Sequence, residues 1–432
     1  MIAYFFPPIG GGGIQRTMKF VKYLPDFNWE PIVLTVKDGL WISKDDSLLN
    51  GLSNDLKIFR TNCFGLQSVF KSSWNKKNNT MQYNSMSDII KKFYRNILRI
   101  VFFLLPDFAS GWFFYAARTG EKIINSNDID IIYTTSPPFS EHFIGWILKK
   151  MTKKKWVADF RDSHVSDPNL SNDFKGSIKR FKRKIYEKKI ILNSDLIITA
   201  TDPIRQDLLN RYQGKLSESE VITITNGFDR DDFKNLQKIN HNNKLTITYT
   251  GTFQGKQTAF YFIESLKSAI KENKNLMNDI HIRFIGEFSH YDKELFSDDE
   301  IKDVIEIIEY VPYEKSLAYQ INSDVNLLII SASKKEGGDQ IFTGKIFEYI
   351  GADKPIFALV PNGVAKDLIL SEKLGIVADP KNVLDIKLKI LYLYKLWKNN
   401  KLEIVQDTAL LEKFERKELT RILANNFNDL IK

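Results

Sequence analysis

Short apolar segments alternate with helical ones along this chain, and the alternation begins twice, at residues 2–6 and again at 245–250. Further expected strands in the first run are 31–36, 56–60, 130–135, 156–160, 196–200 and 221–224, and in the second run 281–285, 305–310, 325–330, 355–360 and 375–377. Strands separated by helical segments need crossover connections, which favours parallel pairing. The pattern therefore predicts an α/β chain of two tandem doubly wound, Rossmann-like parallel-sheet domains.

The boundaries follow from where the pattern stops. We expect an N-terminal domain over 1–234, a polar linker over 235–243 and a C-terminal domain over 244–400. Residues 401–432 read as C-terminal helical sequence that could pack back on the first domain. Ligands of such sheets bind at the carboxyl ends of the strands, so two domains facing each other would enclose one central cleft.

Composition excludes several classes of protein. One cysteine among 432 residues excludes an internal disulfide, and five histidines without ligand spacing make a structural metal unexpected. No stretch reaches the ~18 uninterrupted apolar residues of a spanning helix. The opening residues lack the basic leader of a signal peptide. These features predict a cytoplasmic protein.

The formal net charge of +9 is unevenly distributed. Residues 89–105 predict a basic amphipathic helix, which an aromatic segment follows at 112–115, and residues 174–192 predict a second basic helix. Such helices can be solvated outer faces, surfaces that dock on an anionic membrane, or nucleic-acid contacts. Nucleic acid is the least favoured partner, because no nucleic-acid-reading motif accompanies the charge.

Four consecutive glycines, Gly10 to Gly13, lie between the first expected strand and the first expected helix. Glycines allow the backbone to approach an anion closely, and the following helix start offers unpaired N–H groups. A turn without a ligand is the plain alternative. A dinucleotide fingerprint fits less well because Gln15 stands where a third glycine or alanine is needed, and no Walker loop follows.

Several short motifs resemble, in order and over essentially the whole chain, those of bacterial family 4 glycosyltransferases of the GT-B fold, of the capsule or O-antigen type. They are the opening Tyr4–Pro8 with Gly10–Gly13, Ser136–His142, Asp159–Asp162, Thr225–Asp229, Thr250–Phe253, Phe284–Glu287 and Thr343–Tyr349. Each motif is weak alone, and their common register across both halves gives the resemblance its weight.

The resemblance implies a retaining, metal-independent enzyme without cofactor. It would move a hexosyl or N-acetylhexosaminyl group from a nucleoside-diphosphate sugar, with UDP the favoured nucleotide, to a lipid-linked glycan in surface polysaccharide biosynthesis. The helix at 89–105 would hold the enzyme peripherally on the inner face of the cytoplasmic membrane, and no nucleic acid would be bound.

The resemblance also implies a donor site. Its expected members are Gly11, Gly12, Gly13, Gly251, Thr252, Lys256, Gly286, Thr343, Gly344, Lys345 and Glu348. Backbone N–H groups and the two lysines would stabilise the charge that develops on the leaving diphosphate. Glu348 would accept hydrogen bonds from the two ribose hydroxyls. For Lys256 the alternative is an ordinary loop lysine, and for Lys345 it is a surface ion pair with Glu348.

Other positions carry a role by resemblance only. His142 and Glu336 would act beside Lys345 in catalysis, His142 by contacting the donor sugar. The family often has a glutamate where this chain has Gln340, so Glu336 or Asp339 could take its place, or backbone groups of Gly337 and Gly338 could serve instead. Acceptor-binding or structural roles stay open for three further residues, Arg161, Asp162 and Asn226.

Two other functions remain open. A nucleotide-sugar 2-epimerase would share the architecture but would act on the donor with no acceptor. A non-catalytic partner subunit would keep the fold after losing a key glutamate, which Gln340 suggests, and would bind nucleotide weakly or not at all.

Overall fold

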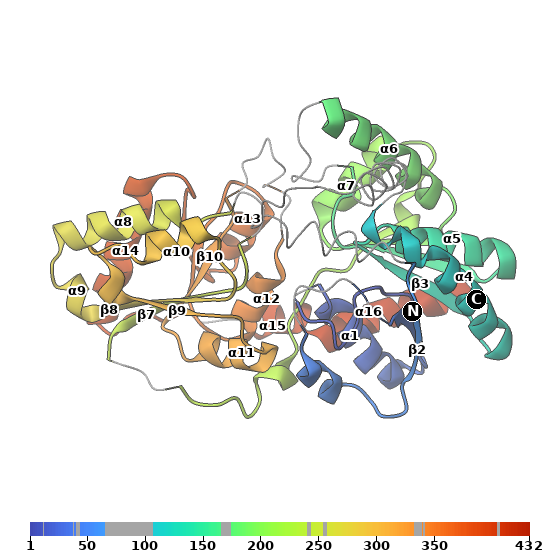
Figure 1. Cartoon of the computed structure of the whole chain (residues 1–432), viewed down its shortest axis with the longest axis horizontal. Coiled ribbons are helices and arrows are strands. Elements are labelled where there is room, and N and C mark those ends of the chain that lie inside the picture. Colours follow the sequence, from blue (N-terminus) through green and yellow to red (C-terminus); the bar gives the residue numbers. More distant parts are fainter. Residues whose placement is uncertain are drawn as a thin grey trace, which may run out of the picture. The chain divides into compact units, whose positions relative to one another are not determined.

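A computed structural model describes residues 1–11, 13–37, 39, 44–64, 107–165, 174–239, 243–253, 257–331, 339, 342–403 and 407–432. The chain divides into two compact units (Figure 1). The first unit comprises Met1–Thr225 and Thr420–Lys432, and the second comprises Asn226–Leu419. The first boundary therefore falls before the expected residue 234, and the last residues group with the first unit.

The first unit contains a parallel sheet in the strand order β2-β1, then Ile2, then β3-β4-β5-β6. The strands are β1 (Ile32–Val36), β2 (Lys57–Thr61), β3 (Ile131–Ser136), β4 (Lys155–Phe160), β5 (Leu196–Thr199) and β6 (Val221–Thr223). Ile2 forms parallel bridges to Leu34 of β1 and Thr134 of β3, and so joins the two groups of strands.

The strand expected over residues 2–6 is wrong in its length. Only Ile2 forms a ladder bridge, and the backbone N–H of Tyr4 donates instead to the Glu141 carboxylate at 2.8 Å. A side chain that takes a backbone donor stops the ladder, and Pro7 and Pro8 offer no donor beyond it. The segment nevertheless occupies the position of a central strand.

Helices cover both faces of this sheet. They are α1 (Gln15–Tyr23), α4 (Phe113–Ser126), α5 (Ser140–Thr152), α6 (Phe174–Ile191), α7 (Asp202–Arg211) and α16 (Arg416–Ile431). Tyr133 of β3 packs against Phe20 of α1 and Phe427 of α16 on one face. Thr134, the next residue, faces α5 on the other. Because successive side chains of β3 point to opposite faces of the sheet, this strand packs against a helical layer on each side.

The second unit has six parallel strands among its described residues, in the order β12-β11-β10-β7-β8-β9. The strands are β7 (Leu245–Thr250), β8 (Ile280–Ile285), β9 (Ile305–Ile308), β10 (Val325–Ile329), β11 (Ile356–Leu359) and β12 (Gly375–Ala378). Counted within the unit the order is 6-5-4-1-2-3, which is the doubly wound order of the Rossmann fold. The order reverses between β7 and β10.

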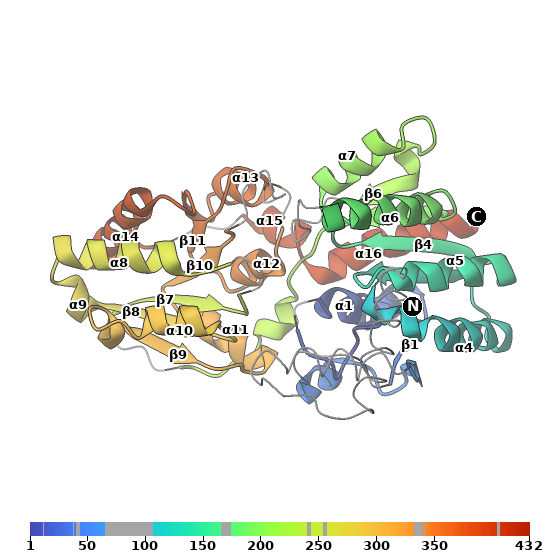
Figure 2. The same cartoon turned by 45° about the horizontal axis from the view of Figure 1, so that its top comes forward.

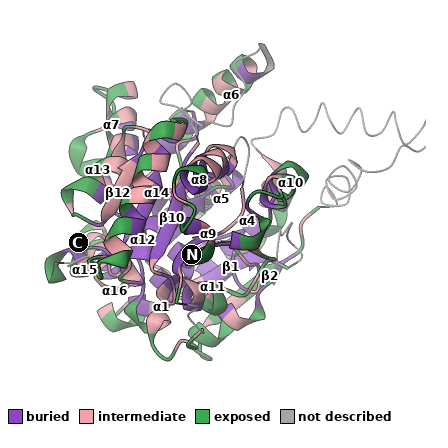
Figure 3. Cartoon of the chain, turned by 90° about the vertical axis from the view of Figure 1, so that its left-hand side faces the viewer, coloured by how far each residue is buried: buried purple, intermediate pink, exposed green. Residues whose placement is uncertain are grey.

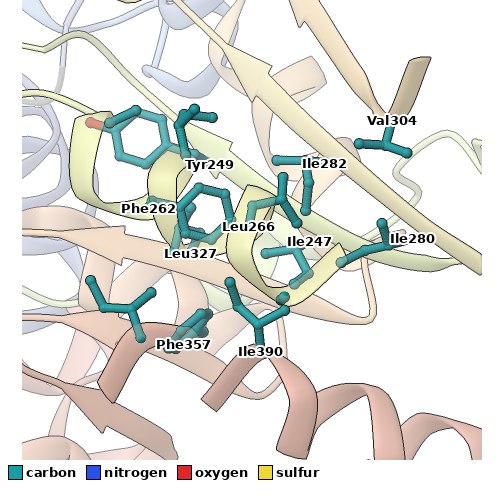
Figure 4. Close-up of a cluster of buried hydrophobic side chains, with 14 of the residues drawn as sticks. Ile247, Tyr249, Phe262, Leu266, Ile280, Ile282, Val304, Leu327, Phe357 and Ile390 are labelled. Atoms are coloured by element: carbon teal, nitrogen blue, oxygen red, sulfur yellow. The ribbon is translucent and has the colours of Figure 1, made fainter. Parts of the chain in front are cut away.

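The largest core of the second unit lies on one face of this sheet. Figure 4 shows Ile247 and Tyr249 of β7 together with Leu327 of β10, facing Phe262 and Leu266 of α8. Successive strand residues point to opposite faces, so Thr246, Thr248 and Thr250 point away from this core. All six β7 residues are buried, because helices cover both faces.

The helices of the second unit are α8 (Phe260–Glu272), α9 (Leu276–Asp279), α10 (His290–Phe296), α11 (Tyr313–Ile321), α12 (Gly344–Gly351), α13 (Val364–Ser371), α14 (Val383–Lys398) and α15 (Thr408–Lys413). Helices α8 and α14 lie side by side over this largest core (Figure 2). Figure 3 shows their outer sides as exposed or intermediate, with buried β10 behind them. Helix α12 packs on the opposite face through Ile346 and Phe347.

The described helices include none that combines the length and the apolar character required to cross a bilayer.

Candidate functional site

The first turn of α12 positions two charged side chains at the carboxyl edge of the second unit's sheet. Thr343 caps the helix, and its hydroxyl accepts a hydrogen bond from the backbone N–H of Lys345 at 3.3 Å. Ile346, Phe347, Tyr349 and Ile350 point into the core and fix the rotation of the helix. Lys345 and Glu348, three residues apart, therefore share the half-buried side.

Lys345 extends from α12 to the end of β7. Its Nζ donates a hydrogen bond to the Tyr249 hydroxyl at 2.8 Å and lies 4.5 Å from the centroid of the Tyr249 ring. Burial lowers the pKa of Lys345 to about 8, against the opposing effect of Glu348. Because burial has removed water from the Lys345 ammonium group, an anion that binds beside it would stabilise its charged form.

Gly251 provides the space that the Lys345 side chain occupies. A Cβ on Gly251 would lie 2.4 Å from Cε and 2.7 Å from Nζ of Lys345, and the φ angle of Gly251 is +117°. Other residues would therefore clash there and would also be strained. The positive φ favours glycine here, and any side chain at this position would push the end of Lys345 aside.

The expectation that the Gly251 turn provides N–H donors to phosphate fails for Gly251 itself, because the N–H groups of both strand-end glycines are hydrogen-bonded within the sheet. The N–H of Gly251 donates to the Ile285 carbonyl at 2.8 Å, and that of Gly286 donates to Ile308 at 2.9 Å. A Cβ on Gly286 would lie 2.4 Å from the Gly251 carbonyl oxygen. Both amides thus extend the sheet, and the two glycines let adjacent turns pack closely.

Glu348 lies beside a buried polar network. Gln320 of α11 donates from Nε2 to Glu348 Oε2 at 3.2 Å and to Thr250 Oγ1 at 3.0 Å. Tyr349 anchors the same helix turn by donating from its hydroxyl to the Leu327 carbonyl at 3.0 Å. Burial raises the pKa of Glu348, while Gln320, Lys345 and Arg416 oppose that effect. The Glu348 carboxylate is thus fixed by a hydrogen bond from Gln320 and lies on the same side of α12 as the Lys345 ammonium group.

The structure thus brings together five expected donor-site residues, Gly251, Gly286, Thr343, Lys345 and Glu348, with Gly344 at the first position of α12. Thr252 is half-buried directly after Gly251, and Asn226 is the first residue of the second unit. Gly12, Lys256, Glu336, Gln340 and the helix expected over 89–105 lie outside the described residues, whereas Asp339 is described and half-buried.

The first unit contains the other glycine turn. Gly11 has a φ angle of +117° and open space where a Cβ would lie, whereas Gly13 lies against Arg161. Arg161 donates to the backbone carbonyls of Gly13, Ser136 and Pro137. Arg161 therefore connects the glycine turn to the loop after β3. Of the two roles that the sequence left open for this residue, these contacts fit the structural one. Asp162 is exposed.

His142 lies in the core of the first unit and has no exposed surface. Its Nδ1 is 2.8 Å from Thr134 Oγ1, and the same hydroxyl oxygen accepts a hydrogen bond from Trp156 Nε1 at 2.9 Å. Burial lowers the pKa of His142 to about 3. A neutral, enclosed imidazole argues against the expected contact with the donor sugar and fits a structural role.

Sequence reasoning missed a buried ion pair. Arg16 of α1 donates from Nε and Nη2 to the two carboxylate oxygens of Asp159, at 2.8 and 2.9 Å. Tyr133 donates to the same carboxylate from its hydroxyl at 2.5 Å. Asp159 stands in one of the quoted motifs, but its separation of 143 residues from Arg16 gives no spacing signal that could pair the two.

Gln320 and Tyr249 were missed for the same reason. They lie in α11 and β7, outside the helix that carries Lys345 and Glu348, and only the sheet order brings them there.

No protein-family model matches the chain. A curated relative, an uncharacterized glycosyltransferase of Methanocaldococcus jannaschii, is 22% identical over 285 residues, or 64% of this chain and 68% of that protein.

Solved structures cover nearly the whole chain. A glycosyltransferase from Rickettsia africae is 18% identical, with a TM-score of 0.62 over 100% of this chain and 98% of that one. The Anabaena protein HepE, solved with UDP-glucose, is 11% identical, with a TM-score of 0.65 over 99% and 98%. A Listeria monocytogenes protein assigned to the UDP-N-acetylglucosamine 2-epimerases is 12% identical, with a TM-score of 0.53 over 96% and 93%. Together with the sheet order of each unit, these likenesses identify the GT-B fold: two Rossmann-like parallel-sheet domains.

Proposed function

We propose that this protein is a glycosyltransferase whose second unit binds a nucleoside-diphosphate sugar, with UDP as the favoured nucleotide. The observation that carries the proposal is the pairing of Lys345 and Glu348 on one side of α12, beside Gly251 at the carboxyl edge of the sheet. Ligands of doubly wound sheets bind at this edge, where the strand order reverses. The similarity to HepE, solved with UDP-glucose, supports the choice of donor.

In this proposal Lys345 binds the diphosphate and Glu348 accepts hydrogen bonds from the ribose hydroxyls. The ammonium group is within reach of the Gly251 turn and would stabilise the charge that develops on the leaving diphosphate. Gln320 holds one oxygen of Glu348 and leaves the other for a hydroxyl donor. The Tyr249 hydroxyl positions the lysine.

The first test is titration of nucleoside diphosphates and their sugars, observed by saturation-transfer NMR. Glu348→Gln keeps the shape but weakens acceptance of two hydroxyl donors, so we expect at least tenfold weaker binding, since hydrogen bonds to a charged group contribute about 1.5–3 kcal/mol. Glu294→Gln, at a side chain 66% exposed on α10, is the matched control and should bind normally. If no nucleotide binds to the wild type, the partner-subunit alternative gains.

The stereochemistry, metal independence and acceptor are further parts of the proposal. We expect retention of the anomeric configuration, activity in the presence of EDTA, and transfer to a lipid-linked glycan of a surface polysaccharide. These parts rest on the motifs that resemble family 4 glycosyltransferases. NMR assignment of the product anomer tests the first of them, and an inverted linkage would contradict it.

A 2-epimerase is the second candidate, favoured by one structural likeness. It would bind the same donor, so nucleotide binding does not separate the two functions. Incubation of the donor sugar without acceptor does: an epimerase changes the sugar at carbon 2, whereas a transferase leaves it intact apart from slow hydrolysis.

A further inference from the structure

Helix α6 of the first unit exposes apolar side chains in a row. Phe181 is 65% exposed, Ile185 is 53% exposed, and Leu192, directly after the helix, is 43% exposed. These positions are separated by four and seven residues, so they lie along one stripe of the helix. Single exposed apolar residues are ordinary, whereas three along one stripe give the helix an exposed apolar side.

Exposed lysines flank the stripe on both sides. Lys184 and Lys188 lie along one side of it and Lys189 lies along the other, by the helical angle of 100° per residue. The only acidic residue of α6, Glu187, is on the opposite, buried side, where it accepts from the Tyr212 hydroxyl at 3.0 Å and pairs with Arg211. The charged residues on the exposed side of the helix are therefore all positive.

The neighbouring helix α5 continues this surface. Its Trp146 ring lies beneath two ammonium groups, with Lys150 Nζ at 4.4 Å and Lys189 Nζ at 3.9 Å from the ring centroid. Met151, at the end of α5, is 47% exposed. Lys189 of α6 thus lies over a ring of α5, so the basic surface extends from one helix onto the other.

From this surface we infer that α6 lies on an anionic lipid bilayer, with Phe181, Ile185 and Leu192 inserted and the flanking lysines on the lipid headgroups. An apolar stripe bordered by lysines is the pattern of a helix that lies in the membrane interface. The inference rests on the proposed function and extends it, because an enzyme on the bilayer surface would reach a lipid-linked acceptor there. It assigns membrane contact to a helix other than the one expected over 89–105.

Helix α14 of the second unit supplies a matched control. It also exposes an apolar stripe, with Leu384 at 59% and Leu388 at 52%. Two of its lysines are paired, Lys387 with Glu272 at 2.7 Å and Lys398 with Asp279 at 2.7 Å. This helix tests whether exposed apolar residues alone are enough.

Flotation of the full chain with vesicles tests the inference. Vesicles of phosphatidylcholine with phosphatidylglycerol should carry the protein, and vesicles of phosphatidylcholine alone should carry much less. Phe181→Ser with Ile185→Ser should weaken partitioning by roughly 100-fold, about tenfold for each side chain. Lys184→Gln with Lys188→Gln should weaken it about 25-fold, about fivefold for each lysine. Leu384→Ser with Leu388→Ser should partition like the wild type.

The outcomes separate this inference from the proposed function. Nucleoside-diphosphate binding, whose residues are in the other unit, is measured on the same preparations, and the urea-unfolding midpoint of each variant, followed by tryptophan fluorescence, shows that the first unit is folded. Unchanged flotation of both α6 variants overturns the inference even if nucleotide binds. Salt-sensitive binding to an oligonucleotide, without flotation, overturns it in favour of nucleic acid. Loss of flotation in both α6 variants but not in the α14 variant supports it, even if no nucleotide binds.

Discussion

At the scale of single residues, Lys345 changes its charge at a pH close to neutrality. Its pKa is lowered to about 8 in the free protein, so it is charged below that pH and neutral above it. Binding of a diphosphate favours the charged form. Nucleoside-diphosphate affinity should therefore fall as pH rises through 8, by about tenfold between pH 7 and pH 9.

Lys345→Met provides the control for this prediction. The variant should bind at least tenfold more weakly at pH 7, because a hydrogen bond to a charged group contributes about 1.5–3 kcal/mol. Any pH dependence that it retains comes from the nucleotide itself. Calorimetric titration of both proteins at the two pH values measures the difference, and equal pH profiles would contradict the assignment of Lys345.

Glu187 is a second residue with a shifted pKa, and it affects stability. Burial raises its pKa from 4.5 to about 7, against the lowering effect of Arg211. Between these pH values the unfolded chain has lost the proton and the folded chain keeps it. The folded state therefore loses stability as pH rises from about 4.5 to about 7, by about 3 kcal/mol in total.

Glu187→Gln removes this pH dependence. Relative to the wild type, the variant should gain about 3 kcal/mol of stability between pH 4.5 and pH 8. Urea unfolding followed by tryptophan fluorescence measures the gain. Glu218→Gln, at a side chain 85% exposed, is the control and should show no such gain. A constant difference between Glu187→Gln and wild type at all pH values would refute the prediction.

At the scale of elements, the turn after β7 depends on the absence of a side chain at residue 251. Gly251→Ala should displace Lys345, since the new Cβ would lie 2.4 Å from its Cε, and should cost about 1–3 kcal/mol in backbone strain. We expect lower stability together with loss of nucleotide affinity. Gly214 also has a positive φ, of +73°, but no atom within 4 Å of a Cβ, so Gly214→Ala should lower stability alone. Thermal unfolding and nucleotide titration of both variants measure the two effects.

The sequence predicted most elements, because a strand buried on both faces needs a run of apolar residues whatever its neighbours are. Strands β7 and β8 begin and end within a residue of the expected limits. The first strand was the exception. Residues 2–6 have the right composition, but Glu141, far along the chain, takes the N–H of Tyr4, and no local pattern reveals that competition.

At the scale of the whole molecule, the end of the chain belongs to the first unit although it follows the second in sequence. Phe427 of α16 is 3% exposed and packs against Trp29, with ring centroids 5.1 Å apart. The Trp29 Nε1–H donates to Asn428 Oδ1 at 3.0 Å. These contacts close the face of the first sheet that carries Tyr133.

Phe427→Ala should therefore destabilise the first unit by about 3–5 kcal/mol, the usual cost of removing a buried phenylalanine. Nucleotide affinity, a property of the second unit, should not change in the folded protein. Ile431→Ala, at a residue 50% exposed, is the control. Unfolding midpoints and nucleotide titration distinguish the outcomes, and weaker nucleotide binding at an unchanged midpoint would speak against this division of roles.

The sequence by itself determined the α/β class, the two runs of strands, and the helix that carries Lys345 and Glu348, because apolar periodicity and a side-chain spacing of three are local properties. Tertiary structure decided the rest. The N–H of Gly251 bonds to the sheet and not to a phosphate, and the Lys345 side chain fills the space beside this glycine. His142 is enclosed in a core, and Arg161 holds the glycine turn against the loop after β3. Each of these depends on which residue, tens or hundreds of positions away, arrives beside a backbone group, and that is set by strand order.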